Sequence, residues 1–323
     1  MLFSVIIPLY NKRHYVRRAV DSVLEQTITD IELIVVDDGS TDGSAEELLD
    51  ILDARLKIIK QENQGEGPAR NTGMRVSSGQ LLAFLDADDA WLPCHLNELF
   101  LLYDRYPNAG LLSTTYVEIN GAGGFVENKW ANVILREVDY FKEAATNIGL
   151  VWSGSAAISR DVYQAVGGFI NVRAGADLEY WARVALEYPV VHSSRITCIY
   201  YRGTGGVMEM IAMEKKNKKE VVNVMSLRDV SPSVAMLCEK MDKSGVSFLN
   251  NSIRQYINGR LTVGIPSLIY EGDFVLARQY MALAILPLNA MQLFYKLVVS
   301  LPEPVLWMIR KSYINIRRLW LEG

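Results

Sequence analysis

The chain has few of the residues that build disulfide frameworks or zinc sites. Its three cysteines, Cys94, Cys198 and Cys238, lie far apart and form no CxxC pair. Its three histidines form no HExxH or similar spacing. This pattern excludes a disulfide-stapled fold and a zinc-thiolate site, and it favours a reducing, cytosolic compartment.

Long hydrophobic runs and an excess of one charge are also missing. The longest apolar stretch, residues 279–295, is interrupted by Pro287 and Asn289. It is therefore shorter than the roughly 20 apolar residues that a membrane-spanning helix needs. The N-terminal run Leu2–Leu9 lacks a basic region and contains Pro8, which indicates a buried strand rather than a signal segment. With 33 basic and 37 acidic residues, the chain gives no indication of a nucleic-acid partner.

The first hundred residues alternate between strand-like and helix-like periodicity. Apolar runs predict strands, and apolar residues at i, i+3 and i+4 predict helices between them. Such alternation predicts an α/β fold with a mainly parallel sheet flanked by helices. The predicted strands cover residues 5–7, 33–36, 56–59 and 81–85, and the predicted helices cover residues 16–24, 45–52 and 68–76.

The rest of the chain changes in character near residue 210. The glycine-rich stretch 120–124 predicts a turn between two strands, residues 160–166 and 177–187 predict helices, and residues 195–201 predict a strand. From Lys215 onward the pattern is mostly helical. We therefore expect an α/β domain over residues 1–210 and a C-terminal helical region over residues 211–323.

Acidic clusters follow two of the predicted strands. Asp37-Asp38 begins a turn rich in glycine and serine. This turn is either part of a binding site or, as an equal alternative, a turn that only caps the following helix. Asp86, Asp88 and Asp89 follow the strand at residues 81–85. Clustered carboxylates repel one another unless a cation offsets them, so this second cluster predicts a site for Mg²⁺ or Mn²⁺.

A third acidic residue, Asp177, begins the helix predicted at residues 177–187. As a plain alternative, Asp177 caps this helix, while Glu179 and Arg183 pair at i, i+4. A carboxylate in this position can also act as a general base if it faces a substrate hydroxyl.

Four ordered motifs carry a family resemblance. They are Val5–Asn11, Val36–Ser44, Gly65–Asn71 and Phe84–Asp89, and shorter matches follow at residues 166–169, 177–183 and 200–202. Together they resemble the inverting glycosyltransferases of family 2, which have the GT-A fold. The resemblance covers about residues 1–205 and does not extend to the C-terminal region.

The resemblance implies a role for each matching residue. Asp177 would be the catalytic base, Asp88 the main metal ligand, and Asp86 would bind the ribose or the metal waters. Tyr10 would stack on the nucleotide base and Asp38 would accept from it, although Tyr10 as a core aromatic and Arg70 as a surface residue are the alternatives. The residues expected to bind the nucleotide-sugar cofactor are Pro8, Tyr10, Asn11, Asp38, Arg70, Asp86 and Ala87.

The implied function is transfer of a sugar from a nucleotide diphosphate donor, UDP-sugar by resemblance, to an acceptor hydroxyl. A glycan or lipid-linked glycan of a bacterial surface polysaccharide is the expected acceptor. A non-catalytic sugar-nucleotide-binding or scaffold protein is the alternative. A dinucleotide-binding oxidoreductase is disfavoured, because the first strand is followed by Tyr10-Asn11-Lys12 and not by GxGxxG.

Two positions depart from the family pattern. Ala176 stands where relatives often have Glu, and no histidine occurs in Gly203-Thr204-Gly205-Gly206, where many relatives have one. These glycines suit a mobile loop over the donor. Acceptor contacts are expected from Ser153 and Ser155, and from three tryptophans that are otherwise core residues: Trp130, Trp152 and Trp181.

The C-terminal segment mixes basic and apolar residues. Residues 296–323 hold five basic and two acidic residues, interleaved with aliphatic side chains and with Trp307 and Trp320. This composition fits a helix on an anionic membrane, which would place the enzyme at the cytoplasmic face of the plasma membrane. Packing on the catalytic domain or on a second copy, as a homo-oligomer, is the nearly equal alternative.

Overall fold

The computed structural model describes residues 1–120, 133–206, 210–211, 224–244 and 249–311. The chain divides into two compact units, Met1–Tyr140 with Gly149–Lys218, and Phe141–Ile148 with Lys219–Gly323. The boundary near residue 210 remains a prediction, and the division adds that residues 141–148 group with the C-terminal helices.

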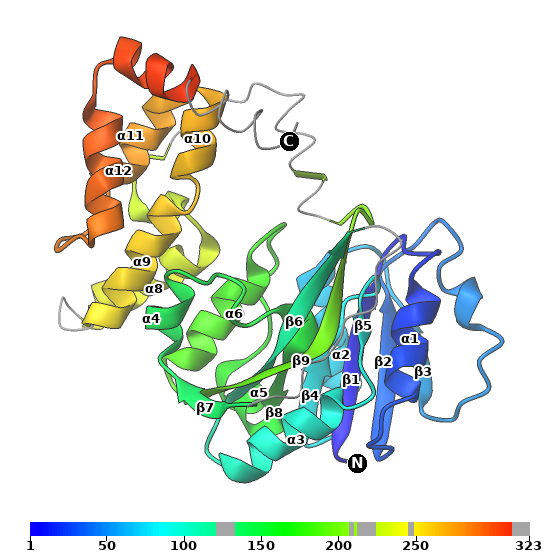
Figure 1. Ribbon diagram of the computed structural model, residues 1–323. Helices are drawn as coiled ribbons and strands as arrows, with labels where there is room; N and C mark the ends of the chain where they lie inside the picture. Colours follow the sequence, from blue (N-terminus) through cyan, green and yellow to red (C-terminus); the bar gives the residue numbers. More distant parts are fainter. Residues whose placement is uncertain (121–132, 207–209, 212–223, 245–248, 312–323) are drawn as a thin grey trace. The chain divides into compact units, whose positions relative to one another are not determined.

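The predicted parallel strands are all present and form one half of the sheet (Figure 1). Their order is β3-β2-β1-β4, with every neighbouring pair parallel. Helices α1 (Val16–Leu24) and α2 (Glu66–Val76) lie between them in sequence, as predicted. The strands are β1 (Phe3–Leu9), β2 (Ile31–Asp37), β3 (Leu56–Lys60) and β4 (Leu81–Phe84).

Helices cover both faces of this half of the sheet. Successive residues of a strand point to opposite faces, so β1 packs against helices on both sides. Val5 and Ile7 of β1 pack in the main core with apolar residues of α1 and of α3 (His95–Arg105). Ile6 faces the other side, where α2 approaches so closely that a Cβ at Gly73 would lie 2.5 Å from the Ile6 side chain. Glycine at this position therefore allows α2 to pack directly on β1.

The second half of the sheet is mixed. It continues from β4 through β8 (Ala156–Ser159), β6 (Leu111–Asn120), β9 (Val190–Arg202) and β5 (Ala90–Trp91), and β7 (Leu135–Val138) also pairs with β9. In this half only β6 and β9 are parallel among the described pairs. The α/β class is confirmed, and the parallel part of the sheet is confined to its N-terminal half and the β6–β9 pair.

The helix predicted at residues 45–52 is wrong. The structure has only a short 3₁₀ turn, η1 (Glu46–Leu48), in this segment. Leu48 is buried, but Leu49 is 71% and Leu52 is 99% exposed, so the apolar positions do not share one buried face. Without a buried face a helix gains little from packing, so the helical conformation ends after one turn.

The remaining predicted helices of the first unit are present. Helix α5 (Arg160–Val166) begins at Ser159, whose hydroxyl accepts from the Val162 N–H, and it ends at Gly167 with φ 86°. Helix α6 (Ala176–Ala185) packs Trp181 against Phe84 of β4 and against Phe169, with ring centroids 5.9 and 5.7 Å apart. Trp181 is fully buried, so it is a core residue and not an acceptor contact.

The second unit is helical, as its sequence pattern predicts. Asn250, Asp273 and Asn289 cap their helices by accepting from a backbone N–H three residues later. Ile265, Ala277, Met281 and Val299 form a small core. Its helices include α4 (Tyr140–Ala144, which the division cuts after Tyr140), α8 (Pro232–Ser244), α9 (Asn251–Thr262), α10 (Ile265–Glu271), α11 (Phe274–Ala282) and α12 (Ala290–Ser300).

Several predictions fall wholly or partly outside the described residues. They are the turn at residues 120–124, Trp130, the stretch from Lys215 to residue 223, and the C-terminal residues 312–323. Within the described ranges, every helix is too short or too polar to cross a membrane.

Candidate active site

The polar residues after β1, β2 and β4 lie along one edge of the sheet. The parallel register pairs Leu9 with Asp37 and Ile6 with Phe84, so the three strands end side by side. Ligands of parallel sheets bind beyond these carboxyl ends. This edge therefore brings the Tyr10-Asn11, Asp37-Asp38 and Asp86–Asp89 segments together.

The segment after β1 is fixed against the segment after β2. Asn11 has φ 50°, and its side-chain oxygen accepts from the Thr41 N–H at 2.8 Å. Its own N–H donates to the Ser40 hydroxyl at 3.1 Å. Pro8 is buried in β1, while Tyr10 is 46% exposed at the strand end. The aromatic ring of Tyr10 is thus not a core aromatic and is accessible to a ligand.

Asp38 is buried and organises the loop that leads into α2. Its carboxylate accepts from the Gln61 side chain at 2.7 Å and from the N–H groups of Gln64 and Gly65 at 2.9 and 2.8 Å. Each carboxylate oxygen has further lone pairs, so these bonds leave room for another donor. Asp38 is thereby joined to the start of α2.

Arg70 of α2 is a buried cation among carboxylates. Its guanidinium binds Glu66 one turn earlier and Asp86 at 2.7 Å, and only 2% of its side chain is exposed. Burial lowers the pKa of Arg70, but the charges on Glu66, Asp86 and Asp177 outweigh this and raise it. Arg70 is therefore an interior residue of the site, not a surface helix residue.

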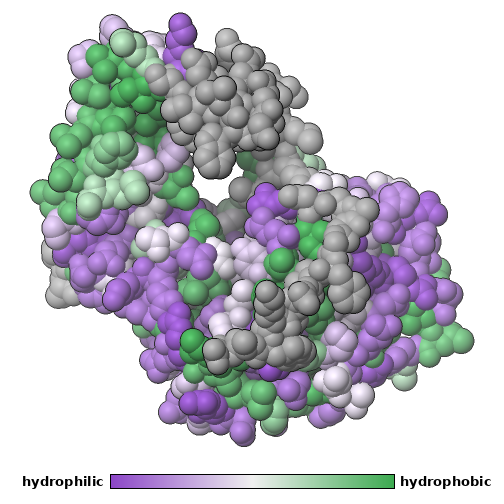
Figure 2. Space-filling view, in the orientation of Figure 1, coloured by the Kyte–Doolittle hydropathy of each residue, from purple (hydrophilic) through white to green (hydrophobic). Residues whose placement is uncertain are grey.

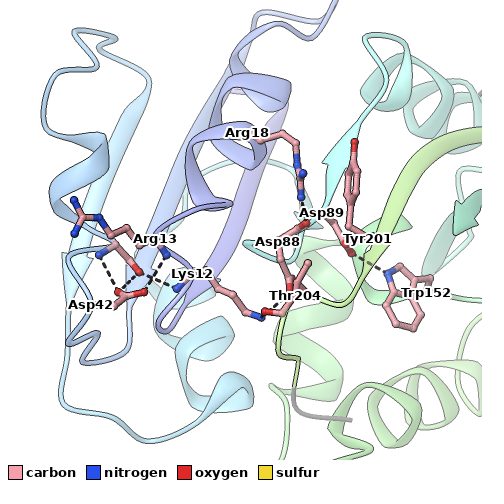
Figure 3. A network of polar contacts seen from close by, with 10 residues as sticks. Lys12, Arg13, Arg18, Asp42, Asp88, Asp89, Trp152, Tyr201 and Thr204 are labelled. Carbon is pink, nitrogen blue, oxygen red and sulfur yellow. Dashed lines mark hydrogen bonds and ion pairs between the residues drawn. The ribbon is translucent and has the colours of Figure 1, made fainter. Parts of the chain in front are cut away.

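Asp88 is bound by a lysine that the sequence analysis did not assign to the site. The Lys12 ammonium lies 2.7 Å from Asp88 Oδ2 and donates to the Thr204 carbonyl at 3.0 Å (Figure 3). The Thr204 hydroxyl donates to the same Asp88 oxygen at 2.6 Å. A basic residue three positions after the end of β1, on the same sheet edge as the acidic clusters, is the sequence signal that would have pointed to Lys12.

Asp89 and Ala87 contact other parts of the chain than Asp88 does. The Asp89 carboxylate accepts from the Tyr201 N–H at 3.0 Å and from the Trp152 indole at 3.4 Å. Burial raises the pKa of Asp89 well above its usual range, and the charges on Asp86 and Asp88 raise it further. Ala87 is packed in the main core, so only its backbone is at hand for a ligand.

Asp177 lies in the first turn of α6. Its Oδ2 accepts from the Ser153 hydroxyl at 3.2 Å. Burial raises the pKa of Asp86, the Arg70 guanidinium opposes this rise, and the charges on Asp88 and Asp177 add to it. The charge of Asp177 thus acts on Arg70 and on Asp86, which form an ion pair with each other.

The other predicted acceptor residues differ in position. Trp152 is half-buried and its ring centroid lies 4.4 Å from that of Tyr200 and 5.3 Å from that of Tyr116. Ser155 is fully buried and donates to the Trp152 carbonyl at 3.1 Å, so it cannot reach an acceptor. Ser153 reaches Asp177 instead.

Divalent-cation ligation depends on how these carboxylates are already paired. The described residues contain no group of three or more His, Cys, Asp or Glu side chains in ligating arrangement. Asp86 is paired with Arg70 and Asp88 with Lys12. Asp88 is the better candidate ligand, because its lysine partner is a single flexible ammonium, whereas Arg70 is buried and doubly bound.

Comparison with known proteins identifies relatives of the N-terminal part of this chain. The chain is 42% identical over 115 residues to the uncharacterized glycosyltransferase alr2836 of Nostoc sp., which covers 35% of this chain and 36% of that protein. It is 41% identical over 115 residues to the UDP-Glc:alpha-D-GlcNAc-diphosphoundecaprenol beta-1,3-glucosyltransferase WfgD of Escherichia coli, covering 32% of this chain and 46% of WfgD. The chain thus spans less than half the length of these two relatives.

Two solved structures share the fold. S. aureus TarS 1-349 in complex with UDP-GlcNAc matches with a TM-score of 0.66 and 17% identity, over 98% of this chain and 92% of that chain. The mannosyltransferase PcManGT from Pyrobaculum calidifontis in complex with GDP-Man and Mn²⁺ matches with a TM-score of 0.51 and 17% identity, over 96% and 87% of the two chains. The sequence model of Glycosyl transferase family 2 matches residues 4–167, half of the chain. The chain therefore belongs to glycosyl transferase family 2.

Proposed function

We propose that this enzyme transfers a sugar from a nucleotide diphosphate donor, a UDP-sugar, to an acceptor hydroxyl with inversion of the anomeric carbon. WfgD is named as an enzyme that uses UDP-Glc, and TarS was solved in complex with UDP-GlcNAc. Both support a UDP-sugar as the donor. The acceptor named for WfgD is a sugar linked to diphosphoundecaprenol, a lipid carrier. This supports a lipid-linked glycan as the acceptor and polysaccharide synthesis as the setting.

The observation that carries the proposal is the position of Asp177. Its carboxylate accepts a hydrogen bond from Ser153, and its charge raises the pKa of both Arg70 and Asp86. In the proposed reaction Asp177 takes the proton of the acceptor hydroxyl as its oxygen attacks the anomeric carbon. The bond from that carbon to the phosphate oxygen breaks on the opposite side, and its electron pair leaves with the diphosphate. General-base help of this kind is typically worth about 10²–10⁴-fold in rate.

The leaving diphosphate gains negative charge, and the chain places cations nearby. Arg70 and Lys12 both lie on the strand-end edge, each paired with one carboxylate of the Asp86-Ala87-Asp88 motif. Asp88, with Asp86 beside it, would hold Mg²⁺ or Mn²⁺, because carboxylate oxygens are the ligands these ions prefer. When bound, such an ion neutralises charge on the leaving group.

The nucleotide would bind at the ends of β1 and β2. Tyr10 offers an exposed ring for stacking on the base, next to Asn11 and Pro8. Asp38 would accept from the base, and its bonds to residues 61, 64 and 65 hold the carboxylate in place for this role. Pre-orientation of this kind lowers the entropy cost of binding.

Membrane contact is part of the proposal and is supported by the second unit. Helix α12 exposes Met291, Leu293, Phe294 and Leu297 beside Lys296, and Trp307 is exposed beyond it. Figure 2 shows apolar side chains gathered over the helices of this unit. Apolar residues with basic neighbours suit an anionic membrane surface, here the cytoplasmic face, and a second copy of the chain is the competing occupant. Binding of the full-length chain to anionic liposomes, against neutral ones, tests this.

The test of the reaction is the variant Asp177→Asn. We expect transfer from UDP-sugars to fall by at least about 10²-fold while donor binding, measured by calorimetry, stays within about twofold of the wild type. Asp161→Asn, an exposed aspartate in the first turn of α5, is the matched control and should leave the rate unchanged. Retention of the configuration, or full activity of Asp177→Asn, would refute the proposal.

A non-catalytic sugar-nucleotide-binding protein is the second candidate. It is favoured by Ala176, by the absence of histidine at residues 203–206, and by the pairing of Asp88 with Lys12. This candidate predicts that a panel of nucleotide sugars raises the melting temperature of the wild type but that no acceptor yields a product. Detection of any transferred sugar decides against it.

A further inference from the structure

Lys12, Asp88 and Thr204 form a closed triangle at the strand-end edge. The Lys12 ammonium contacts both Asp88 Oδ2 and the Thr204 carbonyl, and the Thr204 hydroxyl contacts the same Asp88 oxygen (Figure 3). The side chains of Lys12 and Asp88 are each only 13% exposed. The pair is therefore screened by solvent much less than a surface ion pair.

Each corner of the triangle is held by the backbone around it. The Lys12 N–H donates to the Ser44 hydroxyl at 2.8 Å, and Asp42 in turn binds Ser44. Thr204 stands between Gly203 and Gly205, whose φ angles of 79° and 74° favour glycine. The Asp88 carbonyl accepts from Arg18 of α1. The contact of Lys12 with Asp88 is thus specified by three separate segments.

Each acidic residue of the cluster has its own partner, and the partner of Asp88 is Lys12. Asp86 is bound by Arg70, and Asp89 by the Tyr201 N–H and the Trp152 indole. A divalent cation held by Asp88 Oδ2 would use the oxygen that Lys12 contacts at 2.7 Å. It would then meet the Lys12 ammonium at close range, and two cations cannot share one carboxylate oxygen without strong repulsion.

We propose that Lys12 is the resident counter-ion of Asp88 and that a divalent cation binds there only when the Lys12 ammonium withdraws. Lys12 thereby sets the metal affinity of the site as a positioning residue. The inference rests on the proposed function, in which Asp88 is the metal ligand. It also accounts for a site that lacks the histidine of its relatives yet keeps Asp88 neutralised.

The experiment measures Mn²⁺ binding to the full-length chain without donor, by the electron paramagnetic resonance signal of free Mn²⁺. We expect Lys12→Met to bind Mn²⁺ at least about tenfold more tightly than the wild type, because the competing cation is gone and Asp88 is left unpaired. Lys12→Arg, which keeps the charge, should stay near the wild type. The matched control is Lys60→Met, an exposed lysine paired with Glu46.

Two further measurements locate the effect. Adding Asp88→Asn to Lys12→Met should abolish the gain in Mn²⁺ affinity. Without metal, Lys12→Met should melt at a lower temperature than the wild type, and Mn²⁺ should raise its melting temperature more than that of the wild type. Lys12→Gln gives the same comparison if the Met variant does not fold.

Equal or weaker Mn²⁺ binding by the Lys12 variants overturns the inference, as does tight binding that survives Asp88→Asn. Neither result depends on sugar transfer, because no donor is present. Failure of the proposed reaction would instead appear in the Asp177→Asn measurement, so the two outcomes are distinguishable.

Discussion

The Ser153 hydroxyl donates to Asp177 Oδ2 across 3.2 Å, which ties the turn before β8 to the first turn of α6. The two residues are 24 positions apart in sequence, and Ser153 is buried. Gly175, with φ 81°, precedes α6 and allows the chain to enter the helix at this angle. The carboxylate proposed as the base is therefore oriented by a buried donor.

Replacing Ser153 tests this orientation. We expect Ser153→Ala to lower kcat for transfer by about tenfold, because one hydrogen bond to a charged group is worth roughly 1.5–3 kcal/mol. The KM for the donor should change by less than about twofold, since Ser153 contacts the base and not the proposed nucleotide site. Steady-state kinetics with a saturating acceptor measures both quantities.

Ser155→Ala is the internal control for this experiment. Ser155 is two residues away and fully buried, but its hydroxyl donates to the Trp152 carbonyl. Its loss should cost about 1 kcal/mol of unfolding free energy and leave kcat unchanged. Equal losses of kcat in the two variants would show that Ser153 has only a structural role.

Glu32 gives the first unit a stability that depends on pH. Burial alone would raise the pKa of this carboxyl, but donors from Lys57, Ser4 and Ser78 at 2.6–2.7 Å outweigh it and lower the pKa to about 2. A carboxyl whose pKa is depressed on folding stabilises the protein above its unfolded value, here 4.5. That stability is lost as the pH falls from about 4.5 toward 2.

We therefore expect Glu32→Gln to lower the free energy of unfolding at pH 7 by about 2–3 kcal/mol. The difference from the wild type should shrink below pH 4.5. Urea titrations at several pH values from 7 to 3.5 measure it. Glu46→Gln is the control, because Glu46 is an exposed residue whose pair with Lys60 should contribute less than about 1 kcal/mol. A difference that is constant over this pH range would contradict the prediction.

The packing of the second unit can be tested at Gly259 of α9. A Cβ at this position would lie 2.1 Å from the Ala145 carbonyl oxygen, in the segment 141–148 of the same unit. Gly259→Ala should therefore destabilise the unit by about 1–3 kcal/mol, although alanine favours helices by up to about 1 kcal/mol. Hydrogen exchange of α9 amides measures the change.

Gly264→Ala serves as the comparison within the same unit. A Cβ there meets no atom within 4 Å, and φ is −88°, an ordinary value for alanine. Its stability should stay within about 1 kcal/mol of the wild type. A Gly259→Ala variant as stable as Gly264→Ala would mean that residues 141–148 do not pack on α9.

Periodicity predicted the strands of the parallel half well, because β1, β2 and β4 are buried runs of mostly apolar residues. It also placed β3, although that strand is only partly buried. In the mixed half the strand predicted at residues 195–201 lies within β9, whereas β5 and β8 were missed. Strand β8, with the sequence Ala-Ala-Ile-Ser, has weak strand propensity, and strand β5 has two residues. Such short strands form because long neighbours offer backbone partners, and local sequence does not record this.

The candidate site was predicted in part for a similar reason. The strand-end position of Asp38, Asp86 and Asp88 follows from topology alone, since parallel strands end at one edge. The pairing of Lys12 with Asp88 does not follow from topology. Thr204, which contacts both residues, is 192 positions from Lys12 in the sequence. Their contact depends on the chain returning through β9, which runs as far as Arg202.

Arg18 makes two contacts that join distant parts of the first unit. Its guanidinium lies 3.5 Å above the centre of the Tyr201 ring and donates to the Asp88 carbonyl. Tyr201 in turn donates to Asp89 from its backbone. The end of β9 is therefore joined to the acidic loop at two points, through Arg18 to Asp88 and through the Tyr201 N–H to Asp89, so a displacement of Tyr201 would disturb the contacts of both aspartates.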